Sequence, residues 1–180
     1  MLNAEEEKKI LAYAHELLRA KLIHGPEPSL DLSSGSLEEK RGIFVTLKCG
    51  GRLRGCIGHI LGHEPLGKSI CNMTLAAAFE DPRFPPLSLR ELADVRIHIS
   101  LLTEPVSVKS YKDIRTGIDG IIVTHGWKKG VYLPEVATET GWDARTFFES
   151  CAREKAGLKE QELAGAGIEV FQTEGFEDEY

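Results

Sequence analysis

Two stretches of this 180-residue chain alternate between apolar and polar residues and then reverse direction at glycine. Within residues 42–48 every second side chain is apolar, Gly50-Gly51 follow, and residues 52–57 are again extended in character. A two-residue glycine turn matches the twist of antiparallel strands, so this pattern predicts a β-hairpin. Residues 120–124 and 131–133 flank a glycine-containing polar turn and predict a second hairpin.

Helical patterns are intermixed with these hairpins. Asn3 can cap a first helix, Pro65 suits the first turn of a second, and Asp143 can cap a third. Further strands are predicted at 95–101 and 168–173. The elements lack the regular βαβ alternation of a doubly wound parallel sheet. We therefore expect an α+β fold, a mainly antiparallel sheet with flanking helices.

Short polar motifs complete the pattern. Ser88 and Glu91 have the spacing of a capping box, which predicts one short helical turn. Residues 111–114 predict another such turn. Trp127 and Trp142 are interpreted as core residues or interface anchors, the usual places for a large aromatic side chain.

The composition argues against several kinds of partner and cellular compartment. Lys and Arg number 22 against 28 Asp and Glu, a net charge of −6, which argues against a nucleic-acid partner. No apolar run is long enough to span a bilayer, and the charged N-terminal residues do not resemble a secretion signal. The four cysteines form no C-x-x-C pair and no disulfide framework. We expect a soluble, cytoplasmic protein with reduced thiols.

Residues 53–59, Leu-Arg-Gly-Cys-Ile-Gly-His, hold the candidate site because they place a thiol among glycines and basic residues. A thiolate at neutral pH needs nearby positive charge, since the pKa of free cysteine is about 8.5. Three neighbours of Cys56 can supply that charge: Arg52, Arg54 and His59. Two glycines permit positive φ or close approach of a ligand: Gly55 and Gly58.

The other three thiols are expected to pack rather than react. Cys151 shares the apolar stripe of its predicted helix, Cys49 shares the parity of the buried strand face, and Cys71 lies beside an apolar helical residue. A cysteine nucleophile also needs a base. The sequence leaves that base open among four histidines: His15, His59, His98 and His125.

Two other chemistries are open for the same segment. The spacing C-x-x-H-x-x-x-H of Cys56, His59 and His63, with Glu64 as the nearest fourth ligand, is compatible with zinc. Gly50-Gly51-Arg52 and the glycines of the cysteine motif can expose backbone N–H groups to a phosphate, although neither matches a nucleotide-binding fingerprint. We assign neither a metal nor a cofactor.

Several segments together resemble the AMMECR family and, within it, the prokaryotic AmmeMemoRadiSam system A proteins. The resemblance covers nearly the whole chain in order, and the Arg-Gly-Cys-Ile-Gly core is its most specific part. The segments that carry it are 43–48, 53–58, 76–87, 120–123, 133–137 and 141–143.

This resemblance implies a single domain over residues 1–180, made of a larger and a smaller lobe with the cysteine motif near their junction. The lobe boundary stays open. It implies no established activity and no family-wide catalytic residues. The system name implies partnership with Memo-like and radical-SAM proteins.

Our leading hypothesis is an accessory enzyme in which Cys56 is a nucleophile or carrier thiol in an inter-lobe cleft. Arg54 would orient an anionic group of a small-molecule substrate, Arg52 would assist electrostatically, and Asp81 and Arg83 would line the same cleft. The alternatives are a non-catalytic partner protein of that system and a metal-binding module. The substrate, the reaction and the oligomeric state are left open.

Overall fold

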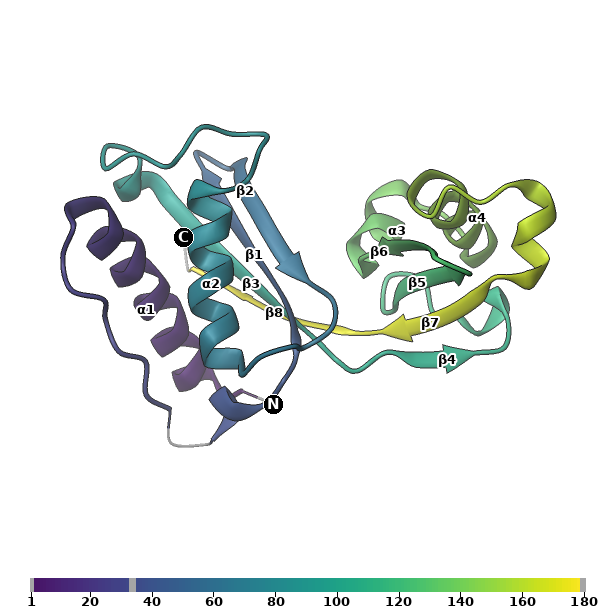
Figure 1. Ribbon diagram of the computed structural model, residues 1–180, viewed down its shortest axis with the longest axis horizontal. Helices are drawn as coiled ribbons and strands as arrows, with labels where there is room; N and C mark the ends of the chain where they lie inside the picture. The colour runs from purple at the N-terminus through teal and green to yellow at the C-terminus, as the bar shows by residue number, and fades with distance from the viewer. Residues whose placement is uncertain (1, 33–34, 179–180) are drawn as a thin grey trace. The chain divides into compact units, whose positions relative to one another are not determined.

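The structure is a computed structural model that describes residues 2–32 and 35–178. It divides into two compact units, each with its own sheet (Figure 1). The first unit runs to Leu101 and resumes at Glu174, whereas the second comprises Leu102–Thr173. The expected α+β fold, with antiparallel sheets and flanking helices, is confirmed.

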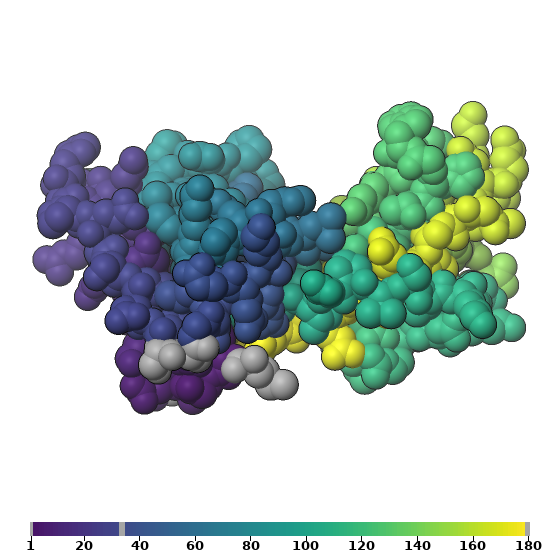
Figure 2. Space-filling view, turned by 60° about the horizontal axis from the view of Figure 1, so that its bottom comes forward, coloured from purple at the N-terminus to yellow at the C-terminus, as the bar shows by residue number. Residues whose placement is uncertain are grey.

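The first unit contains a four-stranded sheet of order β2-β1-β3-β8. Its strands are β1 (Gly42–Cys49), β2 (Arg52–His59), β3 (Val95–Leu102) and β8 (Thr173–Glu177). Two helices, α1 (Ala4–Ile23) and α2 (Leu66–Phe79), pack on the sheet. In the space-filling view the described residues up to about position 100, purple to teal, form one packed body (Figure 2).

The second unit contains another four-stranded sheet, of order β4-β7-β5-β6. Its strands are β4 (Val106–Val108), β5 (Gly120–His125), β6 (Lys128–Tyr132) and β7 (Gly167–Phe171). The helices α3 (Pro134–Thr140) and α4 (Ala144–Ser150) follow β6, and a π-helical turn over Cys151–Lys155 continues α4. Short 3₁₀ helices lie at Ser36–Glu38, Leu92–Asp94, Tyr111–Asp113 and Glu160–Gly165.

The first hairpin forms for the predicted reason. Gly50 and Gly51 have φ values of 56° and 74°, which residues with a Cβ rarely adopt. Apolar side chains on one parity of β1 are fully buried in the core: Ile43, Val45 and Leu47. The predicted helix caps also form, since Asn3 accepts from the backbone N–H groups of Glu5 and Glu6, and Asp143 accepts from that of Thr146.

Three expectations need correction. The final strand predicted over 168–173 is in fact two strands, β7 and β8, which belong to different sheets. The short edge strand β4 was not predicted. Trp127 is 90% exposed at the tip of the β5–β6 turn beside Gly126, so the core interpretation is wrong, and the interface anchor stays a prediction. Among the described residues, no helix combines the length and apolar character that crossing a membrane demands.

Candidate functional site

Cys56 lies on β2, the outermost strand at one edge of the first sheet. It pairs across the hairpin with Thr46, whose hydroxyl donates a hydrogen bond of 3.2 Å to the sulfur. The Cys56 residue is partly exposed and is not in a disulfide. The sulfur therefore has a polar hydrogen-bond partner on the neighbouring strand.

The backbone of Cys56 is held by a carboxylate and a guanidinium. Its N–H donates to Asp81 Oδ2 at 2.9 Å, and its carbonyl accepts from Arg83 Nη2 at 3.3 Å. An edge strand ordinarily leaves such groups unpaired, because no further strand lies beside it. Asp81 and Arg83 therefore act as a clamp that closes the sheet edge at the cysteine. We call this pair the edge clamp.

The two members of the edge clamp also bind each other. Arg83 Nη2 lies 2.7 Å from Asp81 Oδ2, and Arg83 Nε lies 2.9 Å from Asp81 Oδ1. Hydrogen bonds from the Arg83 side chain lower the pKa of Asp81 well below its usual range, and the N–H of Cys56 adds to this effect. The Asp81 side chain is buried, whereas that of Arg83 is 55% exposed. Part of that guanidinium is therefore accessible beside Cys56.

Arg54 occupies an irregular position in the hairpin. Leu47 pairs with Gly55 but Lys48 pairs with Leu53, so Arg54 is the extra residue of a β-bulge. Bulges redirect side chains and often occur next to active sites. The bulge accompanies a buried guanidinium, since the Arg54 residue is only 8% exposed.

Glu91 binds this buried guanidinium. Arg54 Nε lies 2.6 Å from Glu91 Oε1, and Nη2 lies 3.2 Å from Oε2. The hydrogen bond from Arg54 lowers the pKa of Glu91 to about 2. The remaining nitrogen, Nη1, is buried and has no hydrogen-bond partner among the described residues. Two of the three guanidinium nitrogens of Arg54 are therefore bound to Glu91.

Phe84 lies near both arginines. Its ring centroid is 6.0 Å from the guanidinium carbon of Arg54 and 5.5 Å from that of Arg83. These distances allow cation–π attraction. The segment after α2 therefore contributes both the edge clamp and an aromatic ring to the surroundings of β2.

Sequence reasoning named Cys56, Arg54, Asp81 and Arg83 but missed Thr46, Phe84 and Glu91. The hairpin register could have identified Thr46, because it pairs directly with Cys56. Glu91 was interpreted only as a capping residue. The Ser88 backbone N–H and hydroxyl do donate to its carboxylate, at 2.9 and 2.8 Å, yet the same carboxylate also binds Arg54.

The two glycines of the motif are explained by packing against the protein itself. A Cβ on Gly55 would lie 2.0 Å from the backbone oxygen of Ala77 in α2. A Cβ on Gly58 would lie 2.2 Å from the backbone oxygen of Ile43 and 2.6 Å from a ring carbon of Phe44. Close approach of the protein backbone, as opposed to a ligand, therefore requires glycine at both positions.

His59 and Arg52 lie apart from the thiol. Both Cys56 and His59 are on β2, and an odd spacing on a strand places two side chains on opposite faces. Both ring nitrogens of His59 are buried without a hydrogen-bond partner among the described residues, and its ring lies 5.9 Å from that of His63. Arg52 is exposed at the far end of β2, opposite Cys49.

The zinc ligand set predicted from the C-x-x-H spacing does not assemble. The two proposed ligands on β2 point to opposite sides of the sheet. Within residues 2–32 and 35–178, no group of three or more His, Cys, Asp or Glu side chains could hold a metal ion. The metal-binding alternative is therefore wrong for this segment.

The other thiols lie in less favourable surroundings for reaction. Cys151 is fully buried, and burial raises its pKa to about 12. Burial also raises the pKa of Cys49 and of Cys71. The interpretation of Cys151 as a core residue is confirmed, and Cys49 and Cys71 are partly buried against the core of the first unit.

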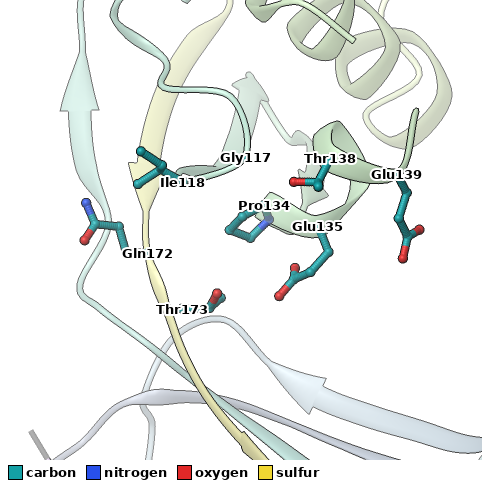
Figure 3. Close-up of a pocket in the computed structure, with 8 residues that line it drawn as sticks. All are labelled: Gly117, Ile118, Pro134, Glu135, Thr138, Glu139, Gln172 and Thr173. Carbon is teal, nitrogen blue, oxygen red and sulfur yellow. The ribbon is translucent and has the colours of Figure 1, made fainter. Parts of the chain in front are cut away.

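A hollow of about 460 Å³ lies in the second unit (Figure 3). Figure 3 shows Pro134, Glu135, Thr138 and Glu139 of α3 on one wall, with Gln172 and Thr173 across from them. This wall includes two residues, Pro134 and Glu135, of the segment 133–137 that carries part of the family resemblance. Its charged side chains are both acidic, so an anionic ligand is not expected in this hollow.

The fold and the site define a class: an α+β protein of two antiparallel sheets that holds a partly exposed thiol at a sheet edge. The family model described as AMMECR1 matches residues 11–176, and the chain belongs to this family.

A protein from Methanothermobacter thermautotrophicus is 47% identical over 127 residues, which cover 67% of this chain and 65% of that protein. A protein from Thermofilum pendens is 37% identical over 95% of this chain and 88% of its own length. The crystal structure of the uncharacterized protein PH0010 from Pyrococcus horikoshii has a TM-score of 0.86 and 31% identity. That match covers 99% of this chain and 94% of the other.

Proposed function

We propose that this chain is an accessory enzyme of the AmmeMemoRadiSam branch, in which Cys56 is a nucleophile or carrier thiol. The proposal is supported by the contacts that hold Cys56. Its sulfur accepts a hydrogen bond from Thr46, and its backbone is fixed by the edge clamp. An enzyme gains rate by holding a reacting group in position before the substrate arrives.

Arg83 is the residue that we assign to the anionic group of a substrate. Its guanidinium is partly exposed and bonds to the carbonyl of Cys56. Arg54, which the sequence suggested for this role, is buried and bound by Glu91. We therefore assign Arg54 a positioning role through the bulge that precedes Gly55 and Cys56.

The wider setting of the proposal comes from the resemblance of residues 53–58 to that branch. Memo-like and radical-SAM proteins would be the partners, and the compartment would be the cytoplasm. The placement of the thiol in an inter-lobe cleft stays a prediction.

Alkylation rates test the reactive thiol. Folded protein is treated with iodoacetamide at pH 7, and mass spectrometry follows each cysteine over time. We expect Cys56 to react fastest and Cys151 to react at least about 100-fold more slowly, because a buried thiol of high pKa is almost entirely protonated. Labelling of Cys56 no faster than that of Cys49 or Cys71 would contradict the proposal.

A matched pair of variants tests the role of the Thr46 hydroxyl in the reactivity of Cys56. Thr46→Val removes the donor to the sulfur and should slow Cys56 alkylation about three-fold, whereas Thr46→Ser keeps the donor and should preserve the rate. Equal rates in both variants would remove Thr46 from the proposed mechanism.

The second candidate is a non-catalytic partner protein. The edge clamp favours it, because a sheet edge held by Asp81 and Arg83 can serve as a rigid binding surface. Cys56→Ser and Arg83→Ala separate the two functions in a strain that depends on the pathway. Loss of pathway product with the complex intact in Cys56→Ser supports the enzyme. Loss of the complex in Arg83→Ala, with Cys56→Ser fully functional, supports the partner protein.

A further inference from the structure

The two edges of the first sheet differ in how they are covered. At one edge the clamp of Asp81 and Arg83 occupies the backbone groups of Cys56. At the other edge, within the part of the chain that the structure describes, β8 has a strand neighbour on one side only in the order β2-β1-β3-β8. An edge strand with an open side is a template for pairing with another extended chain.

A groove runs beside this open strand. It has a volume of about 490 Å³ and lies between α1 and β8. Its apolar side chains are Ala4, Leu11 and Ala12 from the helix and Phe176 from the strand. A volume of this size accommodates side chains of a bound peptide.

The strand end at this groove is fixed. Asp178 Oδ2 accepts from the backbone N–H of Ile97 at 2.7 Å and lies 2.8 Å from His15 Nε2. The His15 contact ties the helix to the end of the strand, so both walls of the groove are held in place before any partner binds. Preformed walls reduce the ordering cost of association.

A groove bounded by an edge strand and a helix suits an extended peptide. In this binding mode the peptide backbone pairs with the edge strand, and alternate side chains enter the groove. Peptide side chains on the parity of Phe176 would face α1, and those on the other parity would lie beside the Glu177 carboxylate.

The charges that line the groove favour a basic occupant. Three carboxylates, those of Glu7, Glu177 and Asp178, line it together with one lysine, Lys8, and with His15, which contacts Asp178. The Glu177 carboxylate is half-exposed, with Lys48 4.0 Å away. A second copy of this chain is a poor occupant, because antiparallel pairing of two β8 strands would bring Glu174 of one copy close to Glu177 and Asp178 of the other. We propose that β8 and this groove bind an extended segment of a partner protein in which basic residues alternate with small apolar residues.

A synthetic peptide tests the proposal. The probe is a seven-residue peptide that alternates lysine and valine, acetylated and amidated at its ends, titrated into full-length ¹⁵N-labelled protein. We expect amide shifts concentrated in residues 173–177 and 11–15, with a Kd of about 0.1–1 mM. A peptide that alternates glutamate and valine should bind at least about ten-fold more weakly.

Two variants of exposed helix residues act as a matched pair. Ala12→Trp fills the groove and should weaken binding of the lysine–valine peptide about ten-fold, whereas Glu16→Trp, on the same helix but outside the groove, should leave it unchanged. Circular dichroism checks that both variants fold.

Three results would overturn the proposal: no shifts at β8 up to 5 mM peptide (about the weakest affinity of interest), equal binding of the two peptides, or equal effects of the two variants. Concentration-dependent dimers in sedimentation velocity, with β8 amides protected only in the dimer, would show that the occupant is a second copy and would also overturn it.

Discussion

Both units of this protein consist of four antiparallel strands with packed helices, but they use their charged and sulfur-bearing residues differently. Two ion pairs show the contrast. Arg54 Nε lies 2.6 Å from Glu91 in the first unit, and Arg145 Nε lies 2.7 Å from Glu149 in the second. The Arg54 side chain is 10% exposed, whereas that of Arg145 is 68% exposed.

The cysteines show the same contrast. In the first unit Cys56 is partly exposed and its backbone is held by ionised side chains, whereas Cys151 in the second unit is sealed in apolar packing. A four-stranded sheet with helices therefore does not by itself create a reactive site. The irregular features of the first unit, a bulge and a clamped edge, distinguish its cysteine from that of the second.

The largest effect is expected from filling the close contact behind the cysteine. Gly55→Ala places a Cβ against the backbone of α2 and should lower the free energy of unfolding by about 3 kcal/mol or more, because helix and strand must move apart. Urea denaturation followed by circular dichroism measures it.

Gly67→Ala is the matched control, because a Cβ there would lie 3.4 Å from Leu37 Cβ and alanine favours a helix. Its stability should be unchanged or higher. An unchanged urea midpoint in Gly55→Ala would show that the contact is looser than the structure indicates.

The next largest loss of stability is expected when the buried ion pair, but not the exposed one, is removed. Arg54→Met leaves the Glu91 carboxylate without its main partner and should cost about 2 kcal/mol. Arg145→Met removes an equally short but exposed pair and should leave the urea midpoint unchanged. Similar losses in both variants would mean that burial does not separate the two pairs.

We expect the stability of the edge clamp to depend on the charge of Asp81 more than on its shape. Asp81→Asn is nearly isosteric but no longer neutralises Arg83, so we expect a lower urea midpoint and faster hydrogen exchange of the Cys56 amide. Asp113→Asn in the second unit, an exposed capping residue, is the control. Exchange of the Cys56 amide at the wild-type rate in Asp81→Asn would exclude a clamp held by charge.

The smallest expected effect is the change with pH in the contribution of Glu91 to stability. The folded pKa of Glu91 is about 2, below its ordinary value of 4.5, so its contribution to stability is complete above pH 4.5 and is lost as the pH falls toward 2. The difference in urea midpoint between wild type and Glu91→Gln should therefore be largest at pH 7 and narrow by pH 3. A difference that does not change with pH would rule out the ionised carboxylate as its source.

The regular elements were predictable because their signals are local. Asn3 and the Gly50-Gly51 turn act on their own neighbourhood, and the buried alternation in β1 follows from a period of two. Strand partners were less predictable. Thr173–Glu177 carries three charged or small residues and pairs in a sheet whose other strands end at Leu102, and no local pattern encodes that pairing.

The site was predicted in part for the same reason. Cys56 and its glycines were visible as a motif, whereas the partnership of Arg54 with Glu91 joins positions 37 residues apart. The motif also misled, because the second strand of the hairpin was predicted to end at residue 57. The strand continues to His59, and this extension separates the thiol from the imidazole.

The first unit is discontinuous in the chain, since its last strand follows residues 102–173. During synthesis the ribosome delivers the whole second unit before β8 emerges. Residues that bind this strand, such as Arg41 with Glu174 and His15 with Asp178, must wait until residues 174–178 have been synthesised. A nascent chain therefore holds an unfinished first sheet, exposed to chaperones, while its inserted neighbour is free to fold.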